Sequence, residues 1–163
     1  MGIRNAAKAI IIDGESILLN KNENSADREF LGLKKGDIYY DLPGGGQNQY
    51  ETLIEAVKRE CLEETGYTVS VEKLAAIYEE IFLDEGFRAE YPEYAHKIYF
   101  IFLCRKAEEP IQEPTEKDLD MLDSEWVKID SIKDMKLHPK VLRENIDSIL
   151  NTDKTLYLGS EYI

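Results

Sequence analysis

Short apolar segments with the length of β-strands recur along most of the chain. Residues 6–13 and 16–20 form two of them, and the pair Asp13-Gly14 between them is a typical turn, so we expect a hairpin there. The tail leaves open whether residues 155–158 add a last strand. Four further segments have strand character: residues 37–42, 69–82, 95–105 and 124–129.

Two other segments repeat their apolar residues at the spacing of one helix face. The first covers residues 50–65 and ends before Gly66, which suits a helix C-cap. The second covers residues 138–150. The predicted inward-facing residues are Leu53, Ile54, Val57 and Cys61 in the first helix, and Val141, Leu142, Ile146 and Ile149 in the second. The remaining polar segments are predicted loops: residues 21–36, 83–94 and 108–119.

Helices and strands are mixed without the strict alternation of a doubly wound parallel sheet, which predicts an α+β or mixed α/β layer arrangement. The chain has 163 residues, enough for one domain whose core needs neither disulfides nor structural metal. We therefore expect a single domain over residues 1–163. Cys61 and Cys104 stand at apolar positions of periodic segments, so we interpret both as buried hydrophobic residues.

The formal net charge of the chain is -13 at pH 7. A chain this acidic repels the nucleic-acid backbone, which disfavours DNA and RNA as partners. No apolar run approaches the roughly 18 residues of a membrane span, and the first residues lack the features of a signal peptide. We therefore expect a cytoplasmic protein without a membrane partner. A phosphate ligand would need a divalent cation and a few basic residues to reverse the local field.

Three carboxylates gather on one face of the first predicted helix. Glu60, Glu63 and Glu64 are three and four residues apart, and Arg59 stands beside them. A cation would relieve their repulsion, and Mg²⁺ and Mn²⁺ prefer such oxygen ligands. Glu51 is eight residues before Arg59, within reach only if it lies at the very start of the helix. The alternative interpretation is a solvated acidic helix face.

A glycine run precedes this helix. Pro43 is followed by Gly44, Gly45 and Gly46, between a predicted strand and the helix. Amide groups exposed by such a loop can hold phosphate oxygens, and its carbonyls could instead complete a metal shell. Ordinary turn chemistry is the alternative explanation. The loop is not a P-loop, because no Gly-Lys-Ser/Thr sequence follows it.

Taken together, the residues from Gly45 to Tyr67 resemble the signature of the Nudix hydrolase family. Gly45 is followed after five residues by Glu51, and after seven more by Arg59-Glu60. An apolar residue, any residue, Glu63-Glu64, any residue, Gly66 and a second apolar residue complete the pattern. Cys61 and Tyr67 fill the two apolar positions, where aliphatic residues are commoner.

The resemblance implies a fold and a set of residue roles. The fold would be an α/β/α sandwich with a mixed central sheet. Glu60 and Glu64 would be the main ligands of Mg²⁺ or Mn²⁺, with Glu63 assisting and a carbonyl of Gly44 or Gly45 completing the shell. Arg59 and Glu51 would orient these carboxylates by a salt bridge, a supporting role that commonly matters almost as much as ligation.

The resemblance also implies hydrolysis of a diphosphate linkage in a small nucleoside diphosphate derivative or nucleoside triphosphate. The general base would be Glu60 or Glu64, and the sequence does not decide between them. In some members of the family a downstream loop supplies the base or a further ligand. Four acidic residues of this chain lie in such a loop and are not ranked: Glu113, Glu116, Asp118 and Asp120.

The sequence does not fix the oligomeric state, and a homodimer is one possibility. Two other functions also stay open at this point. A Nudix-fold module that binds nucleotides without hydrolysis would not need three clustered metal ligands. A purely structural acidic domain would make the signature a coincidence. We interpret His96, His138 and Trp126 as structural. The aromatic residues considered for substrate contact are Phe30, Tyr39, Phe87 and Tyr91, together with the basic residues Arg28, Lys34 and Lys35 of the loop at 27–36.

Overall fold

The structure is a computed structural model that describes residues 2–28 and 31–163. The described strands join one mixed sheet in the order β8-β3-β2-β1-β6-β5-β9, with β4 added beside β1 and β7 beside β2. These strands are β1 (Arg4–Asp13), β2 (Ser16–Glu23), β3 (Ile38–Asp41), β4 (Gly44–Gly46), β5 (Val69–Ile81), β6 (His96–Lys106), β7 (Met121–Lys128), β8 (Leu137–His138) and β9 (Leu156–Tyr162).

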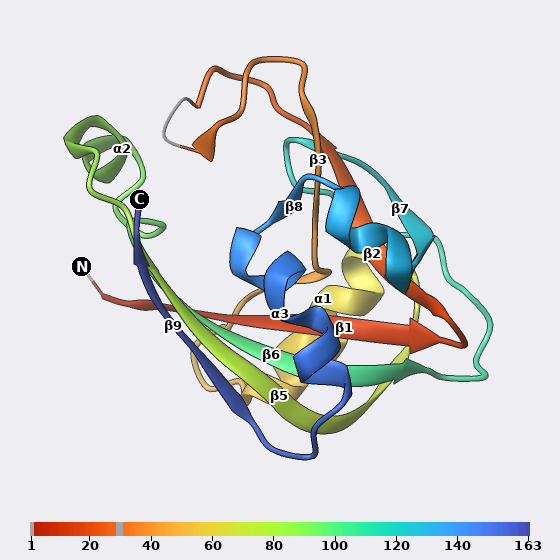
Figure 1. Ribbon diagram of the computed structural model, residues 1–163. Coiled ribbons are helices and arrows are strands. Elements are labelled where there is room, and N and C mark those ends of the chain that lie inside the picture. The colour runs from red at the N-terminus through yellow and green to blue at the C-terminus, as the bar shows by residue number, and fades with distance from the viewer. Residues whose placement is uncertain (1, 29–30) are drawn as a thin grey trace.

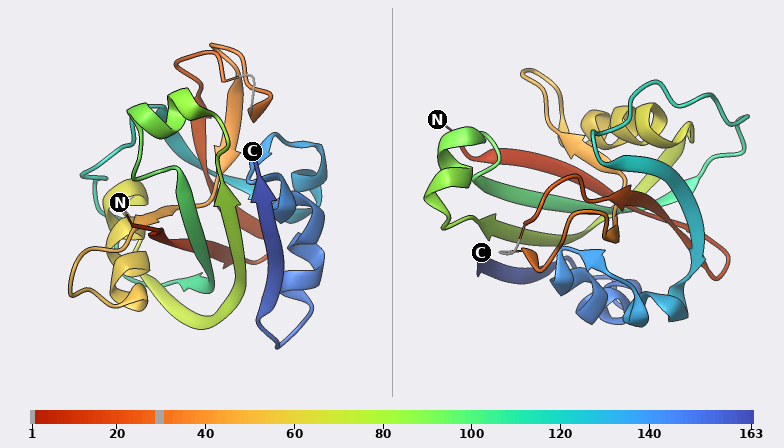
Figure 2. Two further views of the ribbon diagram at one scale, coloured as in Figure 1. Left: turned by 90° about the vertical axis from the view of Figure 1, so that its left-hand side faces the viewer. Right: turned by 90° about the horizontal axis from the view of Figure 1, so that it is seen from above.

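Helices cover both faces of the sheet (Figures 1 and 2), which confirms the predicted α/β/α sandwich with a mixed central sheet. Helix α1 (Leu53–Thr65) packs on one face and α3 (Lys140–Leu150) on the other. Strand β1 runs parallel to β6, and β5 runs antiparallel to β6. A 3-10 helix, η2 (Ile129–Asp134), connects β7 to β8. Within the described residues, no helix is both long and apolar enough to cross a membrane.

The alternation of β1 divides the core in two. Ile10 belongs to the cluster under α3, and its neighbour Ile11 belongs to the cluster under α1. Successive side chains of a strand point to opposite faces, so β1 supplies both cores. Both cysteines are free and buried in the core between α1 and the sheet, as the sequence predicts.

Helix α1 begins and ends where strong local signals stand. The Thr52 side chain accepts a hydrogen bond from the Glu55 amide, and the Glu55 carboxylate accepts one from the Thr52 amide, which forms a capping box. Gly66 adopts a left-handed conformation with φ of 74° and caps the other end, as predicted. The helix therefore begins at Leu53 rather than at residue 50. Residue 51 stays outside it, in the preceding turn.

Several local expectations need correction. The segment at residues 83–94 is not only loop, because Asp84 caps a short helix, α2 (Glu85–Glu90). The glycine run is not only loop either, because Gly44–Gly46 pairs with β1 as strand β4. Ile54 is 48% exposed instead of facing the core. The strand left open at the tail does form, and β9 runs parallel to β5 at the edge of the sheet.

Candidate active site

Strand β4 places the glycine run against the start of α1, and each glycine has a different neighbour where a Cβ atom would be. At Gly44, whose φ is 123°, that atom would meet the Ala7 carbonyl oxygen at 2.2 Å. At Gly45 it would meet the Glu60 carboxylate at 2.5 Å. At Gly46 it would meet the Arg4 guanidinium at 2.4 Å. The absence of side chains in this run therefore lets the β1 backbone, the Glu60 carboxylate of α1 and the Arg4 guanidinium approach one short stretch of backbone.

Arg59 joins the acidic residues predicted for the site. Its Nε and Nη2 donate to the two carboxylate oxygens of Glu51, at 2.7 and 3.0 Å. Its Nη1 donates to Glu60 at 2.8 Å and to Glu63 at 3.0 Å. Nη2 also donates to the Gly46 carbonyl at 3.0 Å. The structure thus brings Glu51, Glu60 and Glu63 to one guanidinium, whose planar fork suits carboxylate pairs.

Glu64 lies deeper than the other carboxylates, with 5% of the residue exposed. Its Oε2 accepts hydrogen bonds of 2.9 Å from the Gly44 amide and from Asn20 Nδ2. Burial raises the pKa of Glu64 to about 7, although Lys8 and the two hydrogen bonds act in the opposite direction. Glu64 is therefore fixed against the glycine run and close to its protonation midpoint at neutral pH.

Glu60 lies between Arg59 and Gly45. Burial raises the pKa of this carboxyl, and Arg59 and Lys8 partly offset that effect. Glu60 and Glu64 are one helical turn apart and both face the glycine run, as the sequence predicts.

Lys8 of β1 belongs to this site and was missed by the sequence analysis. Its Nζ donates to the Leu42 carbonyl at 3.2 Å and to the Gly44 carbonyl, and lies 3.8 Å from Asp41. Burial alone would lower the pKa of Lys8, but surrounding carboxylates, chiefly Asp41 and Glu64, raise it above its usual value. The Lys8 ammonium therefore lies at the oxygen of the Gly44 carbonyl, one of the groups considered for the metal shell.

The four downstream acidic residues have different surroundings in the structure. The Glu116 amide donates to the Glu63 carbonyl at 3.0 Å, so this part of the loop lies against α1. Asp118 is near enough for its charge to raise the pKa values of Lys8 and Asp41. Asp120 forms an ion pair of 2.9 Å with Arg28. Glu113 is exposed and makes no hydrogen bond or ion pair to the described residues.

A hollow of about 320 Å³ opens beside the acidic face of α1. Eight residues line it: Arg4, Gly46, Gln47, Asn48, Arg59, Glu60, Glu63 and Glu116. Its volume is at the lower end of the range of small-molecule sites. It therefore suits the diphosphate part of a ligand better than a complete nucleotide.

The residues around Glu60 and Glu64 have the chemistry that a hard divalent cation requires. All the side-chain groups predicted as ligands are carboxylates, and the absence of a side chain at Gly45 makes room for one of them. In residues 2–28 and 31–163, no three acidic, histidine or cysteine side chains are already arranged as a cation site. Arg59 instead holds Glu60 and Glu63 together.

A second polar cluster lies on the opposite face of the sheet from α1. Glu80 of β5 is fully buried, and its carboxylate lies 2.6 Å from Lys97 Nζ, 2.9 Å from the Tyr99 hydroxyl and 3.1 Å from His138 Nε2. His96 lies 2.7 Å from Glu79. Both histidines are thus engaged by glutamates within the fold.

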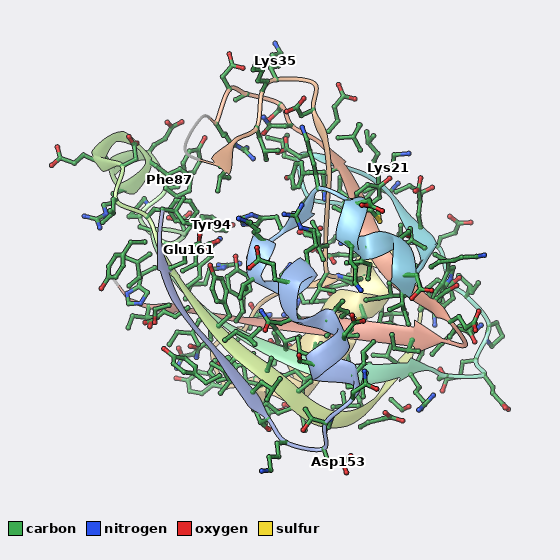
Figure 3. All side chains as sticks on the ribbon, in the orientation of Figure 1. Lys21, Lys35, Phe87, Tyr94, Asp153 and Glu161 are labelled. Atoms are coloured by element: carbon green, nitrogen blue, oxygen red, sulfur yellow. The ribbon has the colours of Figure 1, made fainter. Side chains whose placement is uncertain are left out.

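The aromatic residues considered for substrate contact lie apart from the hollow or outside the described residues. Phe87 packs between Phe82 and Tyr91 on and beside α2, where Figure 3 labels it near Tyr94. Tyr39 points to Asp120 at 3.4 Å. Phe30 lies outside the described residues. Trp126 donates to the Tyr67 hydroxyl at 3.1 Å and packs against the core under α1.

Comparisons with known proteins agree with this arrangement. The NUDIX domain family matches residues 2–147 of the chain. A NUDIX hydrolase from Nitrosomonas europaea superposes with a TM-score of 0.66 at 20% identity, over 90% of this chain and 87% of that one. An ADP-ribose pyrophosphatase from Streptococcus suis gives a TM-score of 0.62 at 19% identity, over 96% and 99% of the two chains.

A MutT protein from Bacillus halodurans gives a TM-score of 0.62 at 22% identity, over 98% of this chain and 90% of that one. At these identities the solved structures show a common fold. No curated protein is similar enough in sequence to count as a relative.

Proposed function

Because the chain belongs to the Nudix hydrolase family, we propose that it is a divalent-metal-dependent pyrophosphohydrolase acting on a small nucleotide-like diphosphate. The observation that carries this proposal is the grouping of Glu51, Glu60 and Glu63 on Arg59 beside the buried Glu64. A structural acidic domain would not need three carboxylates oriented by one guanidinium next to a glycine run.

We propose Glu60 and Glu64 as the main metal ligands, with Glu63 and a carbonyl of Gly44 or Gly45 assisting. Mg²⁺ or Mn²⁺, when bound, would neutralise phosphate charge and make a water molecule more acidic. Glu60 or Glu64 would accept the proton of that water, because both carboxylates lie beside the glycine run where the water would be bound. Arg59 and Glu51 would hold the carboxylates in place.

The polar hollow beside Glu60 supports a small substrate. It has room for a diphosphate, and the net charge of -13 opposes the binding of a long polyanion. The substrate we propose is a nucleoside diphosphate derivative or a nucleoside triphosphate. The base or sugar would lie outside the hollow, against the surrounding loops.

A panel of substrates tests this function directly. Phosphate or nucleotide release should be measured with ADP-ribose, nucleotide sugars, dinucleotides, nucleoside triphosphates and capped RNA, with Mg²⁺, with Mn²⁺ and with EDTA. We expect metal-stimulated cleavage of at least one small compound. Binding without turnover under all metal conditions would identify a nucleotide-binding module instead. Markedly higher efficiency on RNA would show that the proposed substrate class is wrong.

A further inference from the structure

Arg4, at the start of β1, has surroundings unlike those of the other arginines. Its guanidinium carbon lies 4.7 Å from the centre of the Tyr94 ring. On another side the guanidinium lies against the Cα of Gly46, where any Cβ atom would be 2.4 Å from Nη2. Tyr94, labelled in Figure 3, follows α2, which lies over the N-terminal end of β1 in Figures 1 and 2. Arg4 is therefore positioned by a ring and a glycine.

The Arg4 side chain makes no hydrogen bond or ion pair to any described residue, although the chain is strongly acidic. The other five arginines each have a polar partner: Arg28 has Asp120, Arg59 has three glutamates, Arg88 has the Phe82 carbonyl, Arg105 has Glu72 and Arg143 has the Met135 carbonyl. Arginine donates through five N–H groups. Those of Arg4 are held in place but not used within the described fold.

The unused guanidinium lines the hollow beside the acidic face of α1. The other cation there, Arg59, is already committed to Glu51, Glu60 and Glu63. Arg4 is thus the one uncommitted cation among the described residues that line the hollow. Its planar fork matches two oxygens of one phosphate, and the Tyr94 ring fixes its plane before any ligand arrives.

We infer that Arg4 is a substrate-binding residue that holds a phosphate group of the diphosphate in this hollow, with Tyr94 as its platform. The inference rests on the proposed function, because it assigns a contact at the same site. The diphosphate would lie between the Arg4 guanidinium and a cation held by Glu60 and Glu64. Arg4 would then contribute to the affinity for the substrate. Its contribution would be smaller for compounds that have only one phosphate.

Calorimetric titration with methylenediphosphonate, a hydrolysis-resistant diphosphate, tests Arg4 in the presence of Mg²⁺. We expect Arg4→Gln to raise the Kd about tenfold or more, because a charged hydrogen-bond pair to phosphate is lost. Arg4→Lys should raise it less, since the charge remains without the fork. Arg105→Gln is the matched control, because Arg105 pairs with Glu72 on the surface, and its Kd should equal that of the wild type.

The results distinguish this inference from the proposed function. If the wild type binds and cleaves diphosphates but Arg4→Gln binds the probe equally well, the assignment of Arg4 is wrong and the function stands. If the wild type neither binds the probe nor cleaves any compound of the panel, the function itself fails. If Arg4→Gln does not fold, Tyr94→Leu is titrated with the same probe. A Kd raised about threefold would support the role of Tyr94 in positioning Arg4, and an unchanged Kd would overturn it.

Discussion

Arg59 and Glu51 form a two-point contact across eight residues of the chain, with Nε–Oε1 and Nη2–Oε2 distances of 2.7 and 3.0 Å. The contact exists because Glu51 lies before the first turn of α1, so the arginine can reach back along the helix. The third nitrogen, Nη1, is left free for Glu60 and Glu63. One planar group therefore ties the start of the helix to its acidic face.

We expect Arg59→Lys to lower catalytic efficiency about 10- to 100-fold, as is common when a residue that supports metal ligands is lost. Lysine keeps the charge but cannot hold Glu51 at two points while it also contacts Glu60. Titration of activity with Mg²⁺ should show a higher metal requirement, and the melting temperature should fall. Arg105→Lys is the same chemical change at the surface and should alter neither. A change in substrate KM alone would contradict an orienting role.

Glu60→Gln and Glu64→Gln should each lower kcat by about two orders of magnitude or more, because glutamine can neither carry the charge that a metal needs nor accept the proton. Circular dichroism should show the fold retained. Glu63→Gln should have a smaller effect, and Glu144→Gln on α3 should have none. Activity close to that of the wild type in both of the first two variants would remove the proposed mechanism.

Gly45→Ala should reduce activity strongly while the protein still folds. The new methyl group would lie 2.5 Å from the Glu60 carboxylate, which would have to move away from the glycine run. The control is Gly86→Ala in α2, where the nearest atom, Asp84 Oδ1, is 3.2 Å away at the end of a side chain. Measurement of kcat and of the melting temperature for both variants checks this expectation. Equal activity in the two variants would show that the position of Glu60 is unimportant.

The buried Glu80 predicts a dependence of stability on acid. Burial would raise its pKa, but the His138 contact and the Lys97 charge outweigh this and lower it to about 2, from an ordinary value of 4.5. A depressed pKa stabilises the fold above the ordinary value, and this contribution is lost as pH falls from 4.5 toward 2. We expect Glu80→Gln to lower the free energy of unfolding at pH 7 by about 3 kcal/mol.

Urea titrations of the wild type and Glu80→Gln at several pH values measure this difference. It should be full at pH 5 to 7 and shrink as the pH falls from 4.5 toward 2, where about half of the wild-type carboxyl is protonated. A difference that does not change with pH would indicate that packing, and not the charge of Glu80, is the cause. Glu144→Gln serves again as the control, because Glu144 is exposed in its ion pair.

The sequence predicts the parts of the site that lie on one helix. Glu60, Glu63, Glu64 and Arg59 share a helix face through their spacing alone, and Gly66 marks its end. The order of the strands could not be predicted in this way, because β1 pairs with β6 across some ninety residues. The spacing of apolar residues predicts Ile54 on the inward face of the helix, but in the structure this residue is turned away from the sheet.

Residues that join the site from other strands carry weaker signals. Lys8 interrupts the apolar stretch from Ala6 to Ile12 in β1, and a cation at such a position could have marked it as functional. Asn20 offers no such signal, because its partner Glu64 is 44 residues away. Arg4 looks like any polar residue at the start of a strand. Only the fold shows that Tyr94 and Gly46 surround it.

The three glycines of β4 differ in what a substitution at each position would require of its neighbours. A side chain at Gly44 would meet the backbone of Ala7, which no single second mutation can remove. One at Gly45 would meet Glu60, so the replacement could persist only with loss of a proposed ligand. At Gly46 the obstacle is the movable end of Arg4. A side chain at residue 46 could therefore be accommodated by movement or replacement of Arg4, but only at the expense of the phosphate contact assigned to that arginine.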